Sequence, residues 1–291
     1  MTVSATRWDM TNVYPSLESK EFKIAIKKYK SALDEMEVFF KKDSKADSKT
    51  EPKKLGKLLG ESVDRFNALF ELSNTINPYI YSFVTTDSHN QNAMRALSEF
   101  EQMSVQASVL NTKFQAWVGT LGKAAIKKAA KTSDSAKAHE FALNEAAEQS
   151  KYLMSEAEEI LAAELTLSGG NAFGKLQGTV TSQLTVDFEL DGKTQKMPMP
   201  ALINLRSHPD EATRRRGYEA ENIAWEGVKE TLAACMNGVK GETRILDKKR
   251  GREDAIHASI DVCRMDRKTL NAMLDAMKDS FPMFQKYFKH K

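Results

Sequence analysis

Apolar residues recur at helical spacing along most of the chain. The clearest run has spacings of 3, 3, 4, 3, 4, 3 and 4 and comprises Leu97, Phe100, Met103, Ala107, Leu110, Phe114, Trp117 and Leu121. Such spacing places side chains on one face of an α-helix. The run therefore predicts a helix about 45 Å or more in length, at about 1.5 Å per residue, with its apolar stripe facing a helical bundle.

Two further amphipathic helices are predicted before this one. The apolar stripe of the first is Phe22, Ile26, Tyr29, Leu33, Met36 and Phe40, and that of the second is Leu55, Leu59, Phe66, Leu69 and Phe70. Between them, the charged segment 41–54 is expected to be a solvated loop. Asn77-Pro78 is expected to end or kink the second helix, and Asp87 or Ser88 to cap the third. Three long helices in succession predict a bundle of antiparallel neighbours.

The stretch 168–200 interrupts the helical pattern. Gly169-Gly170 can stop the preceding helix, and Asn171 can cap the next one, on which Gly174 and Gly178 are expected to be close-packing positions. No strand is predicted just before these glycines and they do not form a G-x-G-x-x-G pattern, so a phosphate-binding loop is not predicted.

A β-hairpin is predicted near 184–198. Apolar and polar residues alternate from Leu184 to Leu190, and Asp191-Gly192 is a type I′ turn signal. Because two strands alone are only marginally stable, the hairpin is expected to pack on helices. The predicted fold class is all-α, a bundle of long helices with this one small hairpin.

The last hundred residues return to the helical pattern. Ser207-His208-Pro209-Asp210 predicts a helix start, with Ser207 as the cap. The stripe that follows comprises Tyr218, Trp225, Val228, Leu232, Cys235 and Val239. Asp261 or Asp266 is expected to open a final helix that carries Leu270, Met273, Leu274, Met277, Phe281 and Phe284. Apolar positions continue to Phe288, so we expect the chain to be part of a longer unit.

Composition narrows the classes of partner. The 291 residues carry a net charge of +3 and include only two cysteines, Cys235 and Cys263. This charge is too small to predict binding to nucleic acid or an anionic membrane, and the cysteines do not predict a disulfide framework. The sequence shows no apolar signal region at its start and no run long enough to span a bilayer, so a cytoplasmic location is expected.

One dipeptide resembles part of a zinc motif. In H-E-x-x-H, two histidines one helical turn apart bind zinc and the glutamate acts as general base. His139-Glu140 begins such a pattern, but Leu143 stands where the second histidine would be. The remaining histidines, His89, His208, His257 and His290, give no substitute. We therefore predict no catalytic, cofactor-binding or metal-binding residue in this chain.

Several landmarks together resemble the oligoendopeptidase F family, a branch of the thimet-oligopeptidase-like zinc metallopeptidases. Near the start these are Trp8-Asp9 and Tyr14-Pro15-Ser16, and in the middle the segments 168–176 (SGGNAFGKL) and 181–184 (TSQL). Further on, they are Leu205, Pro209-Asp210, Arg214, Tyr218, Arg250-Gly251 and Asp254-Ala255. The chain departs from the family at Phe173, where tryptophan is more frequent, and at Arg252, where an aromatic residue is usual.

The resemblance implies a two-lobed helical shell around a channel, incomplete in this chain, that admits short peptides. It implies zinc for the intact enzyme, bound by H-E-x-x-H and a further glutamate, in a segment that follows the residues present here. Three regions are then expected: a long-helix region over 1–122, a small helical oligopeptidase F N-terminal domain over 123–182, and the hairpin with the first helices of a truncated catalytic domain over 183–291.

Two functions follow as hypotheses. In the first, the chain is the N-terminal part of a zinc metallo-oligoendopeptidase. It forms one wall of the channel, is inactive alone, binds no zinc itself and partners short peptides and a C-terminal catalytic segment. In the second, it is a stand-alone, non-catalytic helical protein that binds peptides or other partners.

Overall fold

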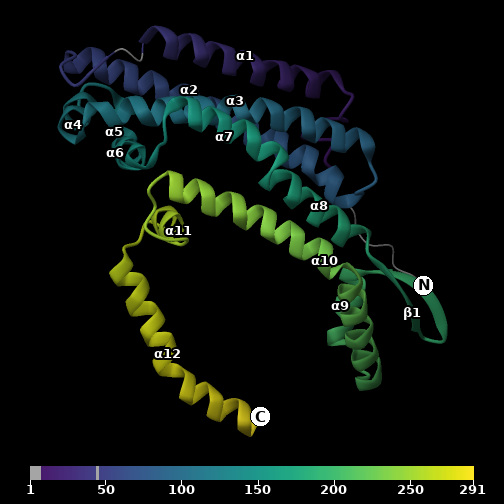
Figure 1. Ribbon diagram of the computed structural model, residues 1–291. Coiled ribbons are helices and arrows are strands. Elements are labelled where there is room, and N and C mark those ends of the chain that lie inside the picture. The colour runs from purple at the N-terminus through teal and green to yellow at the C-terminus, as the bar shows by residue number, and fades with distance from the viewer. Residues whose placement is uncertain (1–7, 44–45) are drawn as a thin grey trace. The chain divides into compact units, whose positions relative to one another are not determined.

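The computed structural model describes residues 8–43 and 46–291 (Figure 1). Two segments lie outside the described residues. One is 1–7, on which most of the prediction that there is no signal peptide rests, and the other is 44–45, within the predicted loop. The chain forms two compact units, Met1–Lys240 and Gly241–Lys291. The three regions predicted from the sequence stay a prediction. In the described part of the chain, no helix is both long and apolar enough to cross a membrane.

The first unit is almost wholly helical. Its long helices are α1 (Lys20–Asp43), α2 (Pro52–Thr86) and α3 (Gln91–Leu121). Shorter helices follow: α4 (Lys123–Ala130), α5 (Asp134–Ala138), α6 (Glu140–Gln149), the 3₁₀ turn η1 (Ser150–Tyr152), α7 (Glu156–Ser168) and α8 (Gly170–Gln183). The hairpin β1 (Thr185–Leu190) and β2 (Lys193–Pro198), α9 (Met199–Asn204), the 3₁₀ turn η2 (Leu205–Ser207) and α10 (Glu211–Lys249) come next. The predicted all-α class with one small hairpin is confirmed.

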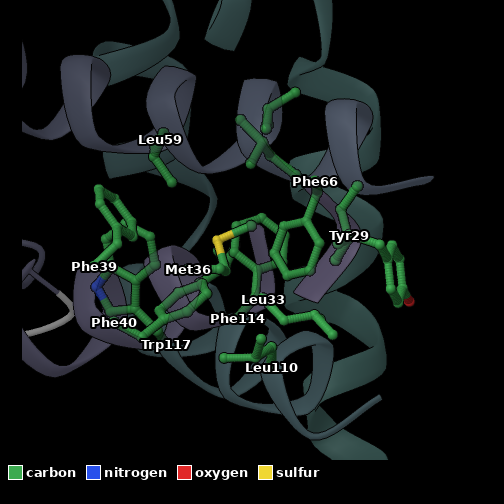
Figure 2. Packing of buried hydrophobic residues seen from close by; sticks show 14 of the residues in the cluster. Tyr29, Leu33, Met36, Phe39, Phe40, Leu59, Phe66, Leu110, Phe114 and Trp117 are labelled. Carbon is green, nitrogen blue, oxygen red and sulfur yellow. The ribbon is translucent and has the colours of Figure 1, made fainter. Parts of the chain in front are cut away.

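The main core lies where α1, α2 and α3 pack side by side (Figures 1 and 2). Aromatic rings fill its centre, with Phe66 5.1 Å from Phe114 and 6.1 Å from Phe40 between ring centroids. Buried members labelled in Figure 2 are Tyr29, Leu33, Met36, Phe39, Phe40, Leu59, Phe66, Leu110, Phe114 and Trp117. The predicted stripes of these three helices thus meet in one core, which is the main source of the unit's stability. Phe70 is the exception in the second stripe, because it is 47% exposed.

The N-terminal arm is held by one of its two aromatic residues. Tyr14 packs edge-on against Phe22 and Tyr79, and the Tyr79 hydroxyl donates to the Tyr14 carbonyl at 2.8 Å. Trp8 shares this arm but is 93% exposed. Of these two aromatic residues, only Tyr14 therefore anchors the segment to the helices.

Of the two outcomes expected at Asn77-Pro78, an end or a kink, the end is wrong, because α2 continues to Thr86 with Pro78 inside it. Proline costs a helix one backbone hydrogen bond and introduces a clash. Here the side chains around it, Ile76, Tyr79 and Ile80, are all buried in the core. Burial on both sides of Pro78 therefore offsets the local cost.

The predicted capping residues of α3 and α8 are both corrected. Asn90, and not Asp87 or Ser88, caps α3 by accepting from the Ala93 amide at 3.0 Å. Asp87 instead accepts from the His89 amide at 2.9 Å in the turn before it. Asn171 does not cap α8, because that helix already begins at Gly170 with Gly169 as its cap residue. The stop of α7 at Ser168, just before Gly169-Gly170, is as predicted.

The hairpin forms as predicted. Asp191 and Gly192 both have positive φ, 53° and 73°, as a type I′ turn requires. The strands pair antiparallel from Thr185↔Pro198 to Leu190↔Lys193. The hairpin packs on α9, η2 and α10 in a second small core made of Phe188, Met197, Met199, Leu202 and Leu205, bordered by Trp225.

A charged pair fastens η2 to α10 beside this small core. The Arg206 guanidinium donates to the Glu221 carboxylate through Nε at 3.1 Å and Nη2 at 2.5 Å. Trp225 Nε1 donates to the same carboxylate at 3.2 Å. The Glu221 side chain is 7% exposed and that of Arg206 59%, so the carboxylate is buried and depends on these partners.

The cap of α10 is Asp210 and not Ser207. Its carboxylate accepts from the Thr213 amide at 2.8 Å and from the Thr213 hydroxyl at 2.6 Å. These hydrogen bonds, the hydroxyl bond first, hold the pKa of Asp210 below its usual value. Ser207 lies in the 3₁₀ turn that precedes the cap.

Helices α8 and α10 touch at a glycine. A Cβ atom built on Gly238 would lie 2.3 to 2.6 Å from ring atoms of Phe173. No side chain larger than hydrogen fits there without moving the ring. The close approach that we predicted for Gly174 and Gly178 is therefore found at Gly238 instead, because nothing among the described residues lies within 4 Å of a Cβ built on either of those two.

Gly238→Ala is expected to destabilise the protein by up to about 2 kcal/mol, because contacts this short place the overpacking cost toward the upper end of about 1–3 kcal/mol, above the helix-propensity gain of roughly 1 kcal/mol. Gly227→Ala, on the same helix and with open space around it, is the matched control and should be neutral or stabilising. Urea unfolding followed by circular dichroism measures both. Equal stability of the two variants would contradict the close packing.

The second unit holds the end of α10, then α11 (His257–Val262) and α12 (Arg267–His290). Asp266 caps α12 by accepting from the Thr269 amide at 2.7 Å, which is one of the two predicted positions. Arg267 Nη2 also contacts Asp254 at 2.9 Å. Among the described residues of α12, none is buried.

Candidate functional site

The described residues bring together no group of three or more His, Cys, Asp or Glu side chains that could hold a metal ion. Cys235 is buried on α10 and Cys263 is exposed. His208 and His257 each accept a backbone amide at Nδ1, both at 3.1 Å. The imidazoles of His208 and His257 are thus each bound to a backbone amide close to them in the chain.

His139 has a structural role. Its Nδ1 lies 2.9 Å from the Ser135 carbonyl, which can only accept, so Nδ1 carries the proton. Its Nε2 then accepts from the Asn67 amide at 3.3 Å. Leu143, at the place of a second zinc ligand, is buried in the main core. The His139 side chain therefore links the junction of α5 and α6 to α2.

A groove of about 370 Å³ lies between the end of α2, the start of α3 and one face of α8. This volume is within the usual range of ligand sites, roughly 300–1,000 Å³. The apolar lining residues are Tyr81, Val84, Met94 and Leu97, and the α8 wall is Gly174, Lys175, Gly178, Thr179 and Ser182. The two glycines leave open the space that side chains would fill.

Two polar contacts fix α8 opposite the other walls of the groove. Lys175 pairs with Glu101 on α3. Near the end of α8, Gln183 Nε2 lies 3.5 Å from His89 Nδ1 in the α2–α3 turn. These contacts link α8 to α3 and to the α2–α3 turn, while the glycine face stays uncovered.

Most polar side chains that line the groove carry a hydroxyl group. Hydroxyls line it at Thr85, Ser88, Ser98, Thr179 and Ser182. Thr85 and Ser182 donate to carbonyls of their own helices. The lining residues include no carboxylate or imidazole, so no hydroxyl of the groove has a general base beside it there. An apolar floor with a hydroxyl rim suits an apolar side chain flanked by peptide groups.

Sequence reasoning did not find this groove. The usable signal was the spacing of Gly174, Gly178 and Ser182, four residues apart on one helical face. The second signal is the opposite wall, where Tyr81 and Met94 are large apolar residues left exposed. These belong to different helices, and only the fold brings them together.

A second, more charged groove of about 320 Å³ lies between α1, α3 and residues 153–156. Lys41 Nζ contacts Glu37 at 2.8 Å, and Lys113 Nζ contacts Glu156 at 3.3 Å. The hydrogen bond and charge of Lys41 hold the pKa of Glu37 below its usual value, with a smaller effect of Lys113. Each cation here already has a carboxylate, which makes this groove a weaker candidate for a charged ligand.

Residues 117–185 match the sequence model of the oligopeptidase F family. The matched stretch runs from the last turns of α3 to the first residue of β1 and contains α8, with its groove wall and the 168–176 landmark. The predicted resemblance to oligopeptidase F is confirmed. The oligopeptidase F match thus includes one of the three walls of the groove.

Solved structures of two peptidases have a similar fold. Oligoendopeptidase-F from Enterococcus faecium matches with a TM-score of 0.73 and 13% identity, covering 90% of this chain and 52% of that one. A putative peptidase from Chlamydophila abortus matches with a TM-score of 0.57 and 14% identity, covering 97% of this chain and 46% of that one. At such identities the likeness shows the fold alone. The chain spans about half the length of these two proteins, and no curated protein matches it.

Proposed function

We propose that the chain is the N-terminal, peptide-binding part of a zinc metallo-oligoendopeptidase that hydrolyses short peptides. The observation that carries this proposal is the match of residues 117–185 to oligopeptidase F. The fold shared with two peptidases along nearly the whole chain supports it. In this proposal the α2–α3–α8 groove is part of the wall of the substrate channel.

Zinc chemistry is assigned to a separate catalytic segment. The described residues do not fit a zinc site, since no three suitable ligands meet and Leu143 replaces the histidine that His139 would need. No catalytic step is therefore assigned to this chain. Its contribution would be to bind and orient the peptide, while a partner segment supplies the metal and the general base.

The groove is suited to an extended peptide. Its apolar floor can take one apolar side chain, and burying such a side chain is worth roughly 1.5–3 kcal/mol. The hydroxyls of Ser98 and Thr179 can bond the peptide groups on either side. The open space at Gly178 lets the peptide approach the backbone of α8 closely.

Peptide binding by the purified chain tests this proposal. A fluorescent hexapeptide with a central leucine is expected to bind, measured by anisotropy. Gly178→Leu fills the groove and should weaken binding about tenfold, equivalent to about 1.4 kcal/mol. Gln177→Leu adds the same side chain to the neighbouring exposed position outside the groove and should leave binding unchanged. Absence of binding, or equal effects of both variants, would contradict the groove as the site.

The same preparation separates the two hypotheses about catalysis. With zinc added, the chain alone is expected to bind a quenched-fluorescent peptide without cleaving it. Zinc-dependent cleavage that a chelator abolishes would show that the chain is itself an enzyme. A stand-alone binding protein, the second hypothesis, is favoured by a groove lining whose residues include no carboxylate or imidazole. It predicts the same binding, with no gain of cleavage when a catalytic segment of a related peptidase is added.

A further inference from the structure

The N-terminal arm and the end of α2 form a third groove, of about 810 Å³, which we call the arm groove. Its lining includes Asp9 and Tyr14 of the arm, Tyr79 and Phe83 of α2, and Asp87 just after that helix. Every residue that lines the arm groove or the α2–α3–α8 groove belongs to the first compact unit. The relation between these two grooves therefore does not depend on the second unit.

The arm groove adjoins the α2–α3–α8 groove. Thr85 lines both of them, and its hydroxyl donates to carbonyls of its own helix. Two residues further on, the chain divides between the grooves, because Asp87 lines the arm groove and Ser88 lines the α2–α3–α8 groove. An extended peptide that leaves the α2–α3–α8 groove at this end can therefore pass directly into the arm groove.

The charge of the arm groove is negative. Its charged residues are the carboxylates of Asp9 and Asp87, and none of its described lining residues is lysine, arginine or histidine. Hydrogen bonds from the Thr11 hydroxyl and amide hold the pKa of Asp9 below its usual value. Both bonds go to Oδ1 of Asp9, and Oδ1 of Asp87 accepts from the His89 amide at 2.9 Å. In each carboxylate, Oδ2 is thus left to accept from a ligand.

Two further features of the arm groove favour a cation. The groove lies at the C-terminal end of α2, where the helix dipole stabilises positive charge. Rings of Tyr14, Tyr79 and Phe83 line it, with centroids 5.0 and 5.1 Å apart in the two pairs that include Tyr79. The faces of such rings attract ammonium and guanidinium groups. Burial, with a smaller effect of the nearby Glu18 carboxylate, raises the pKa of Tyr79.

The α2–α3–α8 groove carries the opposite charge at its far end. Among the described residues that line it, Lys175 alone is charged. Lys175 pairs with Glu101, which lies about 15 Å along α3 from the start of that helix, whereas Gln183 at the other end of α8 faces His89 in the α2–α3 turn. Glu101 offsets part of the Lys175 charge, so the carboxylates of the arm groove have the larger effect. Together the two grooves are complementary to a peptide that is positive at its amino end.

We propose that the arm groove binds a positively charged group on the amino-terminal side of the peptide whose apolar side chain occupies the α2–α3–α8 groove. The bound peptide then runs, in the amino-to-carboxyl direction, from the arm groove toward Lys175. The group is a terminal ammonium or the side chain of a lysine or arginine, which share one chemistry. This inference rests on the proposed function and adds the charge and the direction of the substrate to it.

Anisotropy with the full chain tests for the cation. The probe is a pentapeptide of alanine with leucine at its third position and an uncharged dye at its carboxyl end, compared with its acetylated form. The free amino terminus should bind about tenfold more tightly than the acetylated one, the effect of two exposed ion pairs. This preference should shrink between about 20 mM and about 500 mM salt, because salt screens exposed charges.

Two acetylated peptides test the source of the charge and the direction. One carries lysine two residues before the leucine, and the other carries it two residues after. Tighter binding of the first alone would show that a side-chain ammonium also occupies the arm groove. Tighter binding of neither would restrict that groove to the terminal ammonium. Tighter binding of the second, alone or equally with the first, would overturn the proposed direction.

Substitutions in the chain assign the preference to the arm groove. Asp9→Asn and Asp87→Asn each remove a charge but keep an oxygen for the local hydrogen bonds. Each should reduce the preference for the free amino terminus, and the double variant should abolish it. Asp34→Asn, at an exposed position of α1 outside both grooves, is the matched control and should keep the preference. Circular dichroism shows whether the variants keep their helix content.

Two results would overturn the inference and leave the arm groove to another occupant. They are equal binding of the free and acetylated peptides, and equal effects of Asp34→Asn and Asp87→Asn. The proposed function would stand in either case, provided that Gly178→Leu still weakens binding of the leucine peptides. Absence of binding by every peptide of the set would contradict the proposed function itself, and this inference with it.

Discussion

Gly56→Ala is expected to destabilise the protein by about 3 kcal/mol, the upper end of the usual cost of overpacking. A Cβ atom at this position would lie 2.4 Å from the Ala129 carbonyl oxygen and 2.2 Å from the Thr132 hydroxyl. The hydroxyl can rotate away, but the carbonyl belongs to the backbone of α4. The added methyl group can therefore fit only if α2 and α4 move apart, which opens the core at that end. Urea unfolding followed at 222 nm measures the loss.

The control for Gly56 lies one residue further along. Lys57→Ala removes an exposed side chain and a surface ion pair with Glu61 at 3.8 Å, so its effect should stay within about 0.5 kcal/mol. The double variant Gly56→Ala/Thr132→Ala should not recover stability, because the carbonyl contact remains. Recovery in that variant would mean that the hydroxyl alone limits the approach of the two helices.

Arg206→Ala is expected to cost about 2–3 kcal/mol. It leaves the carboxylate of Glu221, buried on α10, with the Trp225 indole as its remaining hydrogen-bond donor among the described contacts. Breaking a fully buried pair typically costs about 3–5 kcal/mol, and the estimate is lower here because the Arg206 side chain is 59% exposed. Water that already reaches Arg206 can then solvate part of the carboxylate.

A double-mutant cycle checks that the cost comes from the unpaired charge. Glu221→Gln in the Arg206→Ala background should recover part of the stability, because a neutral amide is less costly to bury than a carboxylate. Arg214→Ala, which removes hydrogen bonds to the His208 and Pro209 carbonyls near the same helix start, serves as the comparison. Additive losses in the Arg206–Glu221 cycle would contradict the coupling.

The sequence predicted the parts of the fold that follow from local periodicity. The stripe from Leu97 to Leu121 and the Asp191-Gly192 turn both depend on residues close in the chain, and both formed as expected. Such features are decided within one or two helical turns, where spacing and backbone preference act directly.

The parts that failed depend on contacts between distant residues. Pro78 would end an isolated helix, but Ile76 and Ile80 are held by a core that local sequence does not reveal. Gly174, Gly178 and Gly238 are all helical glycines, and only the packing of Phe173 distinguishes the third from the other two. The candidate groove follows the same logic, since its walls come from helices almost a hundred residues apart.

Because Cys235 is buried, the rate at which its thiol reacts with a reagent measures local opening of the structure. Cys235 lies one turn before Gly238 on α10, close to where Phe173 of α8 seats. A thiol reagent can reach it only after that part of the structure opens, whereas Cys263 on the surface reacts without any opening. The ratio of the two labelling rates therefore measures how often α10 detaches locally, a free energy distinct from that of global unfolding.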